Sequence, residues 1–470
     1  MMSKFIVRFD KGESNIIKIF RWLSALIAVG CTFGALLSDI EYSLWILPVT
    51  YACGMFLLGN RNVVCFTPGI ITLNFVMFCR YVILPAAMYL HGDTTSAYVL
   101  QQGKMHEAIF VMWFELLALM LSIYFTSKYM RKSINQESDT LLDLSRVKNG
   151  SIICLAVVCI LIVLVVRYPH LVGGLELLFK GYIPDSIDIS GVSGMVGILW
   201  KSLTAWLGIY YLYVLKKKNV RGRSLTHSLV LGIAVAVLIS FIGQTTISRW
   251  YSVVTFCAMY FCAIRLFPDR RTSLNRMILL PAVAALVLTS IYKNTGFLKN
   301  QDGMMKYILE LFDVSTLNAY FAGPFSVNNA VYLKQESSIG ISSMFYDLLR
   351  NFPVINHYIN VGKSSVVVYA NYLGRGDQIL PLVGQSMIYF GYAFVPLLSV
   401  ISVMLIRFFD RQYLKSASLL MYVYAFAACW LGLATILNFT ICVSWFYVMI
   451  IPTFALILIT ERLDLKRIRI

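Results

Sequence analysis

Long apolar runs, each about the length of one membrane crossing, recur along the chain. A bilayer-spanning helix needs about 20 mostly apolar residues. Polar connections of varied length separate the runs, so the pattern predicts an all-α polytopic membrane protein with about 12 transmembrane helices in one integral membrane domain, 1–470. The predicted spans are 20–38, 43–59, 66–90, 107–126, 150–166, 194–215, 228–243, 250–266, 277–292, 385–406, 417–436 and 441–459.

The composition agrees with this pattern. Hydrophobic residues make up 59% of the 470 positions and charged residues 13%, whereas soluble chains are roughly 45–50% apolar and about 25% charged. A soluble enzyme, a disordered regulator and a disulfide scaffold are therefore excluded. The ten cysteines lie in or beside apolar runs, which favours buried thiols over a disulfide or a metal site. The charged start of the chain favours a retained first span over a cleavable signal peptide.

The net charge of +17 raises nucleic acid as a partner, and the positions of the basic residues decide against it. With the N-terminus placed inside, 27 of the 40 Lys and Arg residues fall in the segments on the same side. Lys and Arg in short loops mark the cytoplasmic side. The charge therefore indicates orientation, with both termini cytoplasmic and no nucleic-acid partner.

Two segments predicted to lie outside are unusually long. The first covers about 167–195, and the second is a long extracytoplasmic loop over 293–384. Loops of this length are uncommon and usually functional. Helical spacing of apolar residues in Met304–Phe312 and Met344–Phe352 predicts short helices that lie on the membrane surface or cap the spans. A large extracytoplasmic substrate would be handled here.

Three ionisable residues lie well inside the predicted spans: Arg80, Glu115 and Lys201. Such residues are costly in a bilayer and mark candidate functional sites. Arg80 and Glu115 lie at similar depth on antiparallel neighbouring spans, which makes an ion pair between them plausible. All three favour the outer half of the bilayer. The alternatives are a pair that only locks two helices, and for Lys201 a side chain that extends to the outer headgroups.

Further basic residues on the outer side extend this set. Arg249 begins a span in the sequence TTISRWYS, where an interfacial anchor beside Trp250 is the alternative reading. The predicted outer loops add Arg350, Arg375 and His357. Cations kept on the outer side, against the general bias, favour an anionic ligand there. A lipid-linked pyrophosphate would carry its charge at this depth, and arginine binds phosphate in bidentate fashion.

Common catalytic signatures are absent. The sequence contains no GxxxxGK[ST], HExxH or GxSxG, which argues against an ATP-driven pump, a zinc protease and an ordinary serine hydrolase. The five histidines show no ligand spacing, so no cofactor is expected. A general base for a sugar hydroxyl has several candidates in the long loop, and spacing does not choose among His357 and the carboxylates Asp313, Glu336, Asp347 and Asp377.

Four features together resemble the Wzy family of polysaccharide repeat-unit polymerases (O-antigen and capsule polymerases). They are the twelve-span plan with a long late outer loop, Ser248-Arg249-Trp250 at the start of a span, Arg80-Tyr81 with Pro85, and the Leu380–Gln385 stretch before Tyr389-Phe390-Gly391. The resemblance covers most of the chain as an architecture and only these stretches as motifs. Similar proteins often carry Glu directly after the glycine, where this chain has Gln385.

The resemblance implies a glycosyltransferase of a bacterial plasma membrane that joins undecaprenyl-pyrophosphate-linked oligosaccharides on the outer face, without a nucleotide sugar or a metal. Arg249, Arg80 and His357 would be catalytic, with Lys201, Arg350, Arg375, Glu115 and Gln385 binding substrate. Expected partners are the lipid-linked oligosaccharide, membrane lipid, a chain-length regulator and a flippase. A flippase or transporter, and a ligase or acyltransferase with the same cations, remain open. The sequence shows no paired halves typical of transporters.

Overall fold

The computed structural model describes most of the chain as a bundle of helices. The helices before the long predicted loop are α1 (Asn15–Leu36), α2 (Ile46–Gly59), α3 (Pro68–Phe78), α4 (Leu84–His91), α5 (Met105–Gln136), α6 (Gly150–Arg167), α8 (Gly191–Lys217), α9 (Gly222–Ile242) and α10 (Arg249–Leu266). The described residues are 5–6, 15–37, 43–59, 67–91, 103–136, 141–142, 150–169, 191–220, 222–242, 249–278, 314–352, 355–374, 378–416 and 418–462.

The remaining helices follow residue 313. They are α14 (Val314–Phe321), α15 (Pro324–Glu336), α16 (Ile341–Leu349), α17 (Ser365–Leu373), α18 (Leu382–Phe390), α19 (Leu397–Lys415), α20 (Met421–Gly432), α21 (Phe439–Trp445) and α22 (Ile451–Arg462). Two short π-helical segments interrupt the spans, η1 (Cys79–Ile83) and η8 (Phe446–Ile450). A two-residue antiparallel pair joins Phe5–Ile6 to Leu141–Leu142.

The helices are those of a multi-pass membrane protein. Seven helices in the described part are long and apolar enough to cross a membrane. The number is eight if the helix pair Trp250–Leu266 and Pro268–Ile278, which is bent by 114° at its break, forms one span. These helices match the predicted spans 66–90, 107–126, 150–166, 194–215, 228–243, 250–266, 385–406 and 441–459 in place. The predicted span 277–292 lies almost wholly outside the described residues. The count of twelve stays a prediction.

Two predicted spans differ from the helices that form. The stretch 385–406 is broken, because α18 ends at Gly391, whose φ of 82° is a conformation that glycine adopts without a steric penalty. The spanning helix then starts at Tyr392. In the second case, α20 covers only 12 residues of the predicted span 417–436. At 1.5 Å per residue it is about 18 Å long, too short to cross a bilayer core of about 30 Å.

Close helix contacts at glycines hold the centre of the bundle together. A Cβ on Gly432 of α20 would lie 2.7 Å from Thr72 Cβ and 2.9 Å from the carbonyl oxygen of Gly69 on α3. Helix association in a membrane depends on such close packing, because lipid supplies no hydrophobic drive. Every residue of α20 except Tyr424 is buried. This helix therefore forms the core against which α3, α10 and α19 pack.

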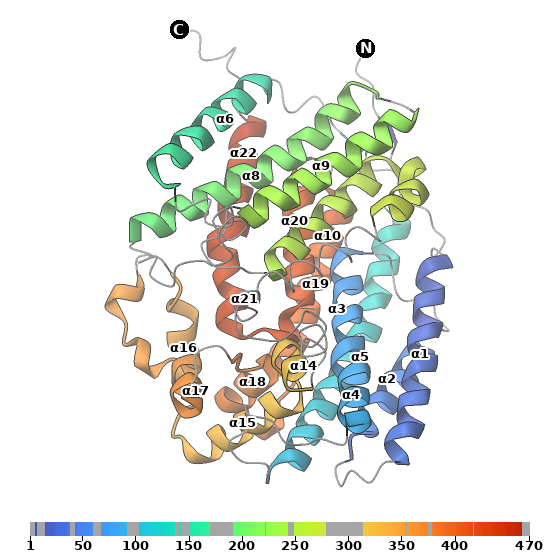
Figure 1. The fold of residues 1–470 in the computed structure, drawn as a ribbon, viewed down its shortest axis with the longest axis vertical. Helices are drawn as coiled ribbons and strands as arrows, with labels where there is room; N and C mark the ends of the chain where they lie inside the picture. The colour runs from blue at the N-terminus through green and yellow to red at the C-terminus, as the bar shows by residue number, and fades with distance from the viewer. Residues whose placement is uncertain are drawn as a thin grey trace, which may run out of the picture.

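The short helices α15 to α18 gather at one end of the bundle, and α6, α8 and α9 lie towards the opposite end (Figure 1). We call the first of these the loop end, because its helices come largely from the predicted loop 293–384. The predicted short helix in Met344–Phe352 is confirmed in part as α16, while Met304–Phe312 lies outside the described residues. The loop end therefore caps one end of the spans with packed helices.

Candidate functional site

The predicted ion pair between Arg80 and Glu115 is present. Arg80 Nη1 lies 3.2 Å from Glu115 Oε2, and neither side chain has any exposed surface. Arg80 belongs to η1, directly after α3, and Glu115 lies on α5. A charge buried this completely is costly unless it is paired and hydrogen-bonded, so the pair ties these two spans together.

Neighbouring groups satisfy the carboxylate more fully than the guanidinium. Glu115 accepts hydrogen bonds from the Tyr81 hydroxyl at 2.8 Å and from Ser399 Oγ at 2.6 Å. Arg80 Nη1 also donates to the carbonyl oxygen of Thr435. Arg80 Nε and Nη2, and the Thr435 hydroxyl, are buried without a partner among the described residues. Two nitrogens of Arg80 thus lack the hydrogen-bond partner that buried donors usually have.

Both π-helical segments of the described part lie at intramembrane cations. Arg80 is the second residue of η1, and Trp445, which faces Lys201, directly precedes η8. A π-helical turn costs hydrogen-bond geometry and is found frequently at functional sites. This local irregularity distinguishes the two positions from the regular helices around them.

Lys201, on α8, is a half-buried cation without a counter-ion among the described residues. Its Nζ lies 5.0 Å from the ring centre of Trp445 and 5.7 Å from that of Tyr251. The two rings are themselves stacked at 4.9 Å. Cation–π contacts of this kind hold an ammonium in place but do not neutralise it. The arrangement therefore leaves a positive charge available to an anion.

The start of α10, at Arg249, is connected to Lys201 through Tyr251. Arg249 is the first residue of α10, two positions before Tyr251, whose ring faces the Lys201 ammonium. The side chain of Arg249 is outside the described residues. The free N–H groups at the start of a helix and its positive dipole end attract anions. Lys201 and the start of α10 thus form a candidate anion site; we call it the Lys201 site.

Gln385 lies in a separate buried cluster at the loop end. Its side-chain oxygen accepts from the backbone N–H of Phe439 at 2.5 Å, and its amide nitrogen donates to Ser365 Oγ and the Tyr389 hydroxyl. Those hydroxyls in turn donate to Asp347, which is 1% exposed. Of the four loop carboxylates named as candidate bases, Asp347 is buried and Glu336 exposed, while Asp313 and Asp377 lie outside the described residues.

The segment between α20 and α21 connects these groups. Residues 433–438, which we call the connector, supply the Thr435 carbonyl to Arg80, and the Leu437 carbonyl accepts from the N–H of Leu382 on α18. Directly after it, α21 carries the Phe439 N–H that binds Gln385 and the Trp445 ring that faces Lys201. The connector and α21 thus contact Arg80, the Gln385 cluster and Lys201.

The structure does not gather the other predicted site residues here. Lys201 is not brought to Arg80 or Glu115, and each has its own neighbours. Arg350 caps the end of α16 with its backbone, and the part of the chain that the structure describes contains no ion pair for it. His357 lies in the short helical turn Ile355–Tyr358 with its side chain outside the described residues, and Arg375 lies outside them altogether.

Buried charges at the other end of the spans were missed by sequence reasoning. Asp410 on α19 accepts from the Gly69 N–H at 2.9 Å and the Thr67 hydroxyl at 2.6 Å, and so caps the start of α3. Arg265 binds the carbonyl oxygens of Leu414 and Ser416. Both fall near the ends of apolar runs, where the sequence gives no signal that separates a buried charge from a solvated one.

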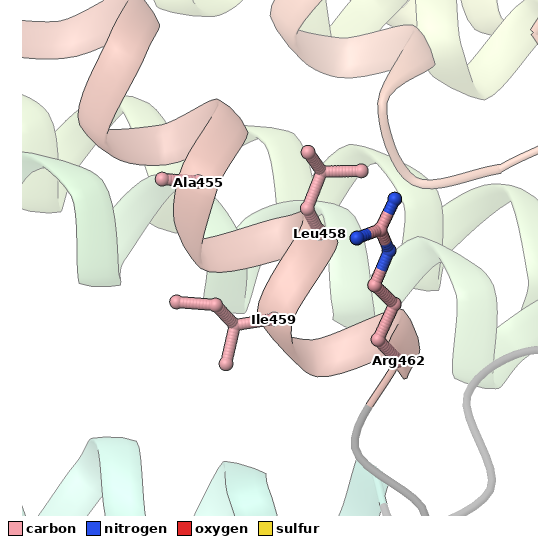
Figure 2. A pocket seen from close by; sticks show the side chains of 4 residues that line it. All are labelled: Ala455, Leu458, Ile459 and Arg462. Carbon is pink, nitrogen blue, oxygen red and sulfur yellow. The ribbon is translucent and has the colours of Figure 1, made fainter.

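One open hollow of about 450 Å³ lies on α22, lined by Ala455, Leu458, Ile459 and Arg462 (Figure 2). It lies at the opposite end of the span from Phe439 and Gln385, so it is remote from the polar clusters. Among the described residues, no group of three or more His, Cys, Asp or Glu side chains is arranged to hold a metal ion. The nine cysteines in this part of the chain are free thiols.

Compared with known proteins, the chain matches no protein-family model, no curated protein and no solved structure.

Proposed function

We propose that this protein is a membrane glycosyltransferase that polymerises undecaprenyl-pyrophosphate-linked oligosaccharide repeat units on the outer face of a bacterial plasma membrane. The loop end then faces outwards. The observation that carries the proposal is the Lys201 ammonium, which lies against two aromatic rings beside the start of α10 and has no counter-ion among the described residues. A half-buried cation without a counter-ion is costly, and an anionic lipid headgroup would neutralise it.

In the proposed reaction, a sugar hydroxyl of one lipid-linked unit attacks the anomeric carbon of the growing chain. A new C–O bond forms, the bond between that carbon and the pyrophosphate oxygen breaks, and the hydroxyl proton passes to a base. The departing undecaprenyl pyrophosphate gains negative charge in the transition state. Lys201, the positive end of α10 and the Arg249 guanidinium would stabilise this charge, which is the largest catalytic contribution in many enzymes.

Arg80 takes a different part in this proposal from Lys201. Because its side chain is fully enclosed and paired with Glu115, it would act from behind the site, by holding the connector through the Thr435 carbonyl. The loop residues Arg350, Arg375 and His357 would complete the site for the acceptor sugar. These roles follow from the proposed position of the loop end over the substrate.

Reconstitution tests the proposal against its rivals. Purified protein in liposomes receives a lipid-pyrophosphate-linked oligosaccharide, and the glycan length is read by gel electrophoresis and mass spectrometry. We expect products of two or more repeat units without ATP or any second protein. Movement of the substrate between leaflets with no lengthening would instead identify a flippase. Transfer to an added non-prenyl acceptor, with no lengthening, would identify a ligase.

A further inference from the structure

The carboxylate of Asp347 gathers an unusual number of donors at the loop end. It accepts from Ser364 Oγ at 2.5 Å, Ser365 N at 3.1 Å, Ser365 Oγ at 2.6 Å, the Tyr389 hydroxyl at 2.5 Å and Thr440 Oγ1 at 3.2 Å. These donors lie on or beside α17, α18 and α21, while Asp347 itself belongs to α16. One side chain therefore connects four helices.

No Lys or Arg pairs with this carboxylate within the described residues. Its charge is stabilised by hydroxyls and one backbone N–H alone, at 1% exposure. Buried carboxylates are tolerated only with such full hydrogen bonding. Because every lone-pair direction is in use and the side chain is covered, a substrate does not reach Asp347 in this arrangement.

Gln385 fixes the direction of the Ser365 and Tyr389 hydroxyl protons in the cluster. Its oxygen faces the backbone N–H of Phe439, which can only donate. The amide nitrogen must then face Ser365 Oγ and the Tyr389 hydroxyl, at 3.0 and 2.9 Å, and donate to both. Both hydroxyls consequently send their own protons to Asp347. Burial, and the Asp347 carboxylate beside it, raise the pKa of Tyr389 above its usual range, which keeps this hydroxyl a donor.

The same cluster holds the connector in place. Gln385 binds Phe439, Asp347 binds Thr440, and the N–H of Leu382 binds the Leu437 carbonyl at 3.0 Å. Two residues before Leu437, the Thr435 carbonyl accepts from the enclosed Arg80 guanidinium. Further along, α21 ends at Trp445, which faces Lys201. The position of the connector and of α21 thus depends on the cluster.

We propose that Asp347 and Gln385 form a directional latch, a carboxylate and an amide joined through Ser365 and Tyr389, that positions the connector and α21 for the transfer reaction. Asp347 is then a positioning residue and not the general base. The proposal rests on the proposed function for its catalytic part, whereas the latch itself is a property of the fold. The latch acts on the substrate indirectly, because it positions Trp445, whose ring faces Lys201.

Exchange of the two groups tests the latch. Asp347→Asn leaves the Ser365 and Tyr389 hydroxyls between two amides, and Gln385→Glu leaves them between two carboxylates. The double variant Asp347→Asn/Gln385→Glu restores one carboxylate and one amide with the Ser365 and Tyr389 hydroxyl protons reversed. The new carboxylate still accepts from the Phe439 N–H, whereas the backbone N–H of Ser365 cannot reverse and loses its acceptor. We measure the midpoint temperature of unfolding in detergent, and kcat and KM for elongation of the lipid-linked donor, with Asp269→Asn at an exposed site as the matched control.

We expect each single variant to lower the midpoint by at least about 3 °C and kcat at least tenfold, with KM changed less than twofold. The double variant should recover part of both losses and exceed the worse single variant, while Asp269→Asn matches the wild type. Failure of the double variant to improve on the worse single variant overturns the latch, as do single variants without effect. A lowered midpoint with unchanged kcat overturns the positioning role.

Two further readouts keep the outcomes distinct. Tyr389→Phe removes one of the five donors and gives a milder test if a single variant does not fold: we expect a kcat reduced at least threefold at unchanged KM, and an unchanged kcat overturns the positioning role. If the wild type does not elongate glycans but the midpoints follow the recovery pattern, the proposed function fails and the latch stands. If the wild type elongates but the midpoints show no recovery, the latch fails alone.

Discussion

The guanidinium of Arg80 and the carboxylate of Glu115 form an ion pair 3.2 Å long in which neither side chain is exposed. The pair joins η1 to α5, and the Ser399 hydroxyl extends it to α19. Its geometry satisfies Glu115 on both oxygens but leaves two Arg80 nitrogens without a partner among the described residues. The pair therefore connects three spans.

Removal of one member of this pair should destabilise the protein strongly. Arg80→Met strands a buried carboxylate and Glu115→Leu strands a buried guanidinium, each expected to lower the free energy of unfolding by about 3–5 kcal/mol. The double variant Arg80→Met/Glu115→Leu should recover most of that loss, because apolar residues of similar volume often replace a buried pair without cost. Denaturation in detergent measures all three variants.

The partly exposed pair of Lys104 and Glu107, with 2.7 Å between Nζ and Oε1, supplies the control. Lys104→Met should leave the free energy of unfolding nearly unchanged, since solvent screens exposed pairs. If Arg80→Met/Glu115→Leu is no more stable than the two single variants, the expectation is wrong. The Arg80–Glu115 pair would then stabilise the fold by more than mutual neutralisation.

The contact between α3 and α20 should tolerate no side chain at Gly432. Gly432→Val places a branched side chain where Thr72 Cβ and the Gly69 carbonyl lie 2.7 and 2.9 Å from a Cβ. Overpacking of this kind typically costs about 1–3 kcal/mol, so we expect a reduced monodisperse fraction in size-exclusion chromatography. Gly197→Val on α8, where a Cβ meets nothing within 4 Å, should behave like the wild type. Equal profiles for the two variants would contradict the close contact.

Tyr389 should make stability depend on pH only in the alkaline range. Burial and the nearby Asp347 raise its pKa in the folded protein, whereas an unfolded tyrosine titrates near pH 10. Its contribution is therefore fully present below about pH 10 and declines as the pH rises further, because the unfolded chain then loses the proton more readily. The midpoint temperature of Tyr389→Phe should lie below that of the wild type at pH 8, and the difference should shrink above pH 10. A difference that grows above pH 10 would contradict this sign.

Depth along the spans was sufficient to predict part of the site. Arg80 and Glu115 lie at similar depth on consecutive antiparallel runs, and such residues meet whenever their faces agree. The helices also follow the apolar runs closely, because membrane helices need about 20 apolar residues whatever their neighbours. The break at Gly391 is not visible in hydropathy, since the residues on both sides of it are apolar.

The rest of the site depends on contacts between distant segments. The neighbours of Lys201 are Tyr251 and Trp445, which come from helices far apart in the sequence. The choice of Asp347 among the loop carboxylates depends on its burial by α17, α18 and α21, which no local pattern encodes. The family resemblance implies that Gln385 binds substrate, and the structure shows hydrogen bonds of its side chain to Ser365, Tyr389 and Phe439, which the sequence does not indicate.

We propose that the Lys201 ammonium binds the pyrophosphate of the substrate, and the rate of glycan elongation by Lys201→Gln measures the effect of this charge. Loss of one preorganised charge at such a site typically costs about 10²–10³-fold in rate. We therefore predict at least a hundredfold loss in kcat for Lys201→Gln in liposomes. Lys201→Arg should keep a substantial part of the activity, and Lys218→Gln, at an exposed position directly after the same helix, should keep all of it. Elongation by Lys201→Gln at the wild-type rate would contradict the account.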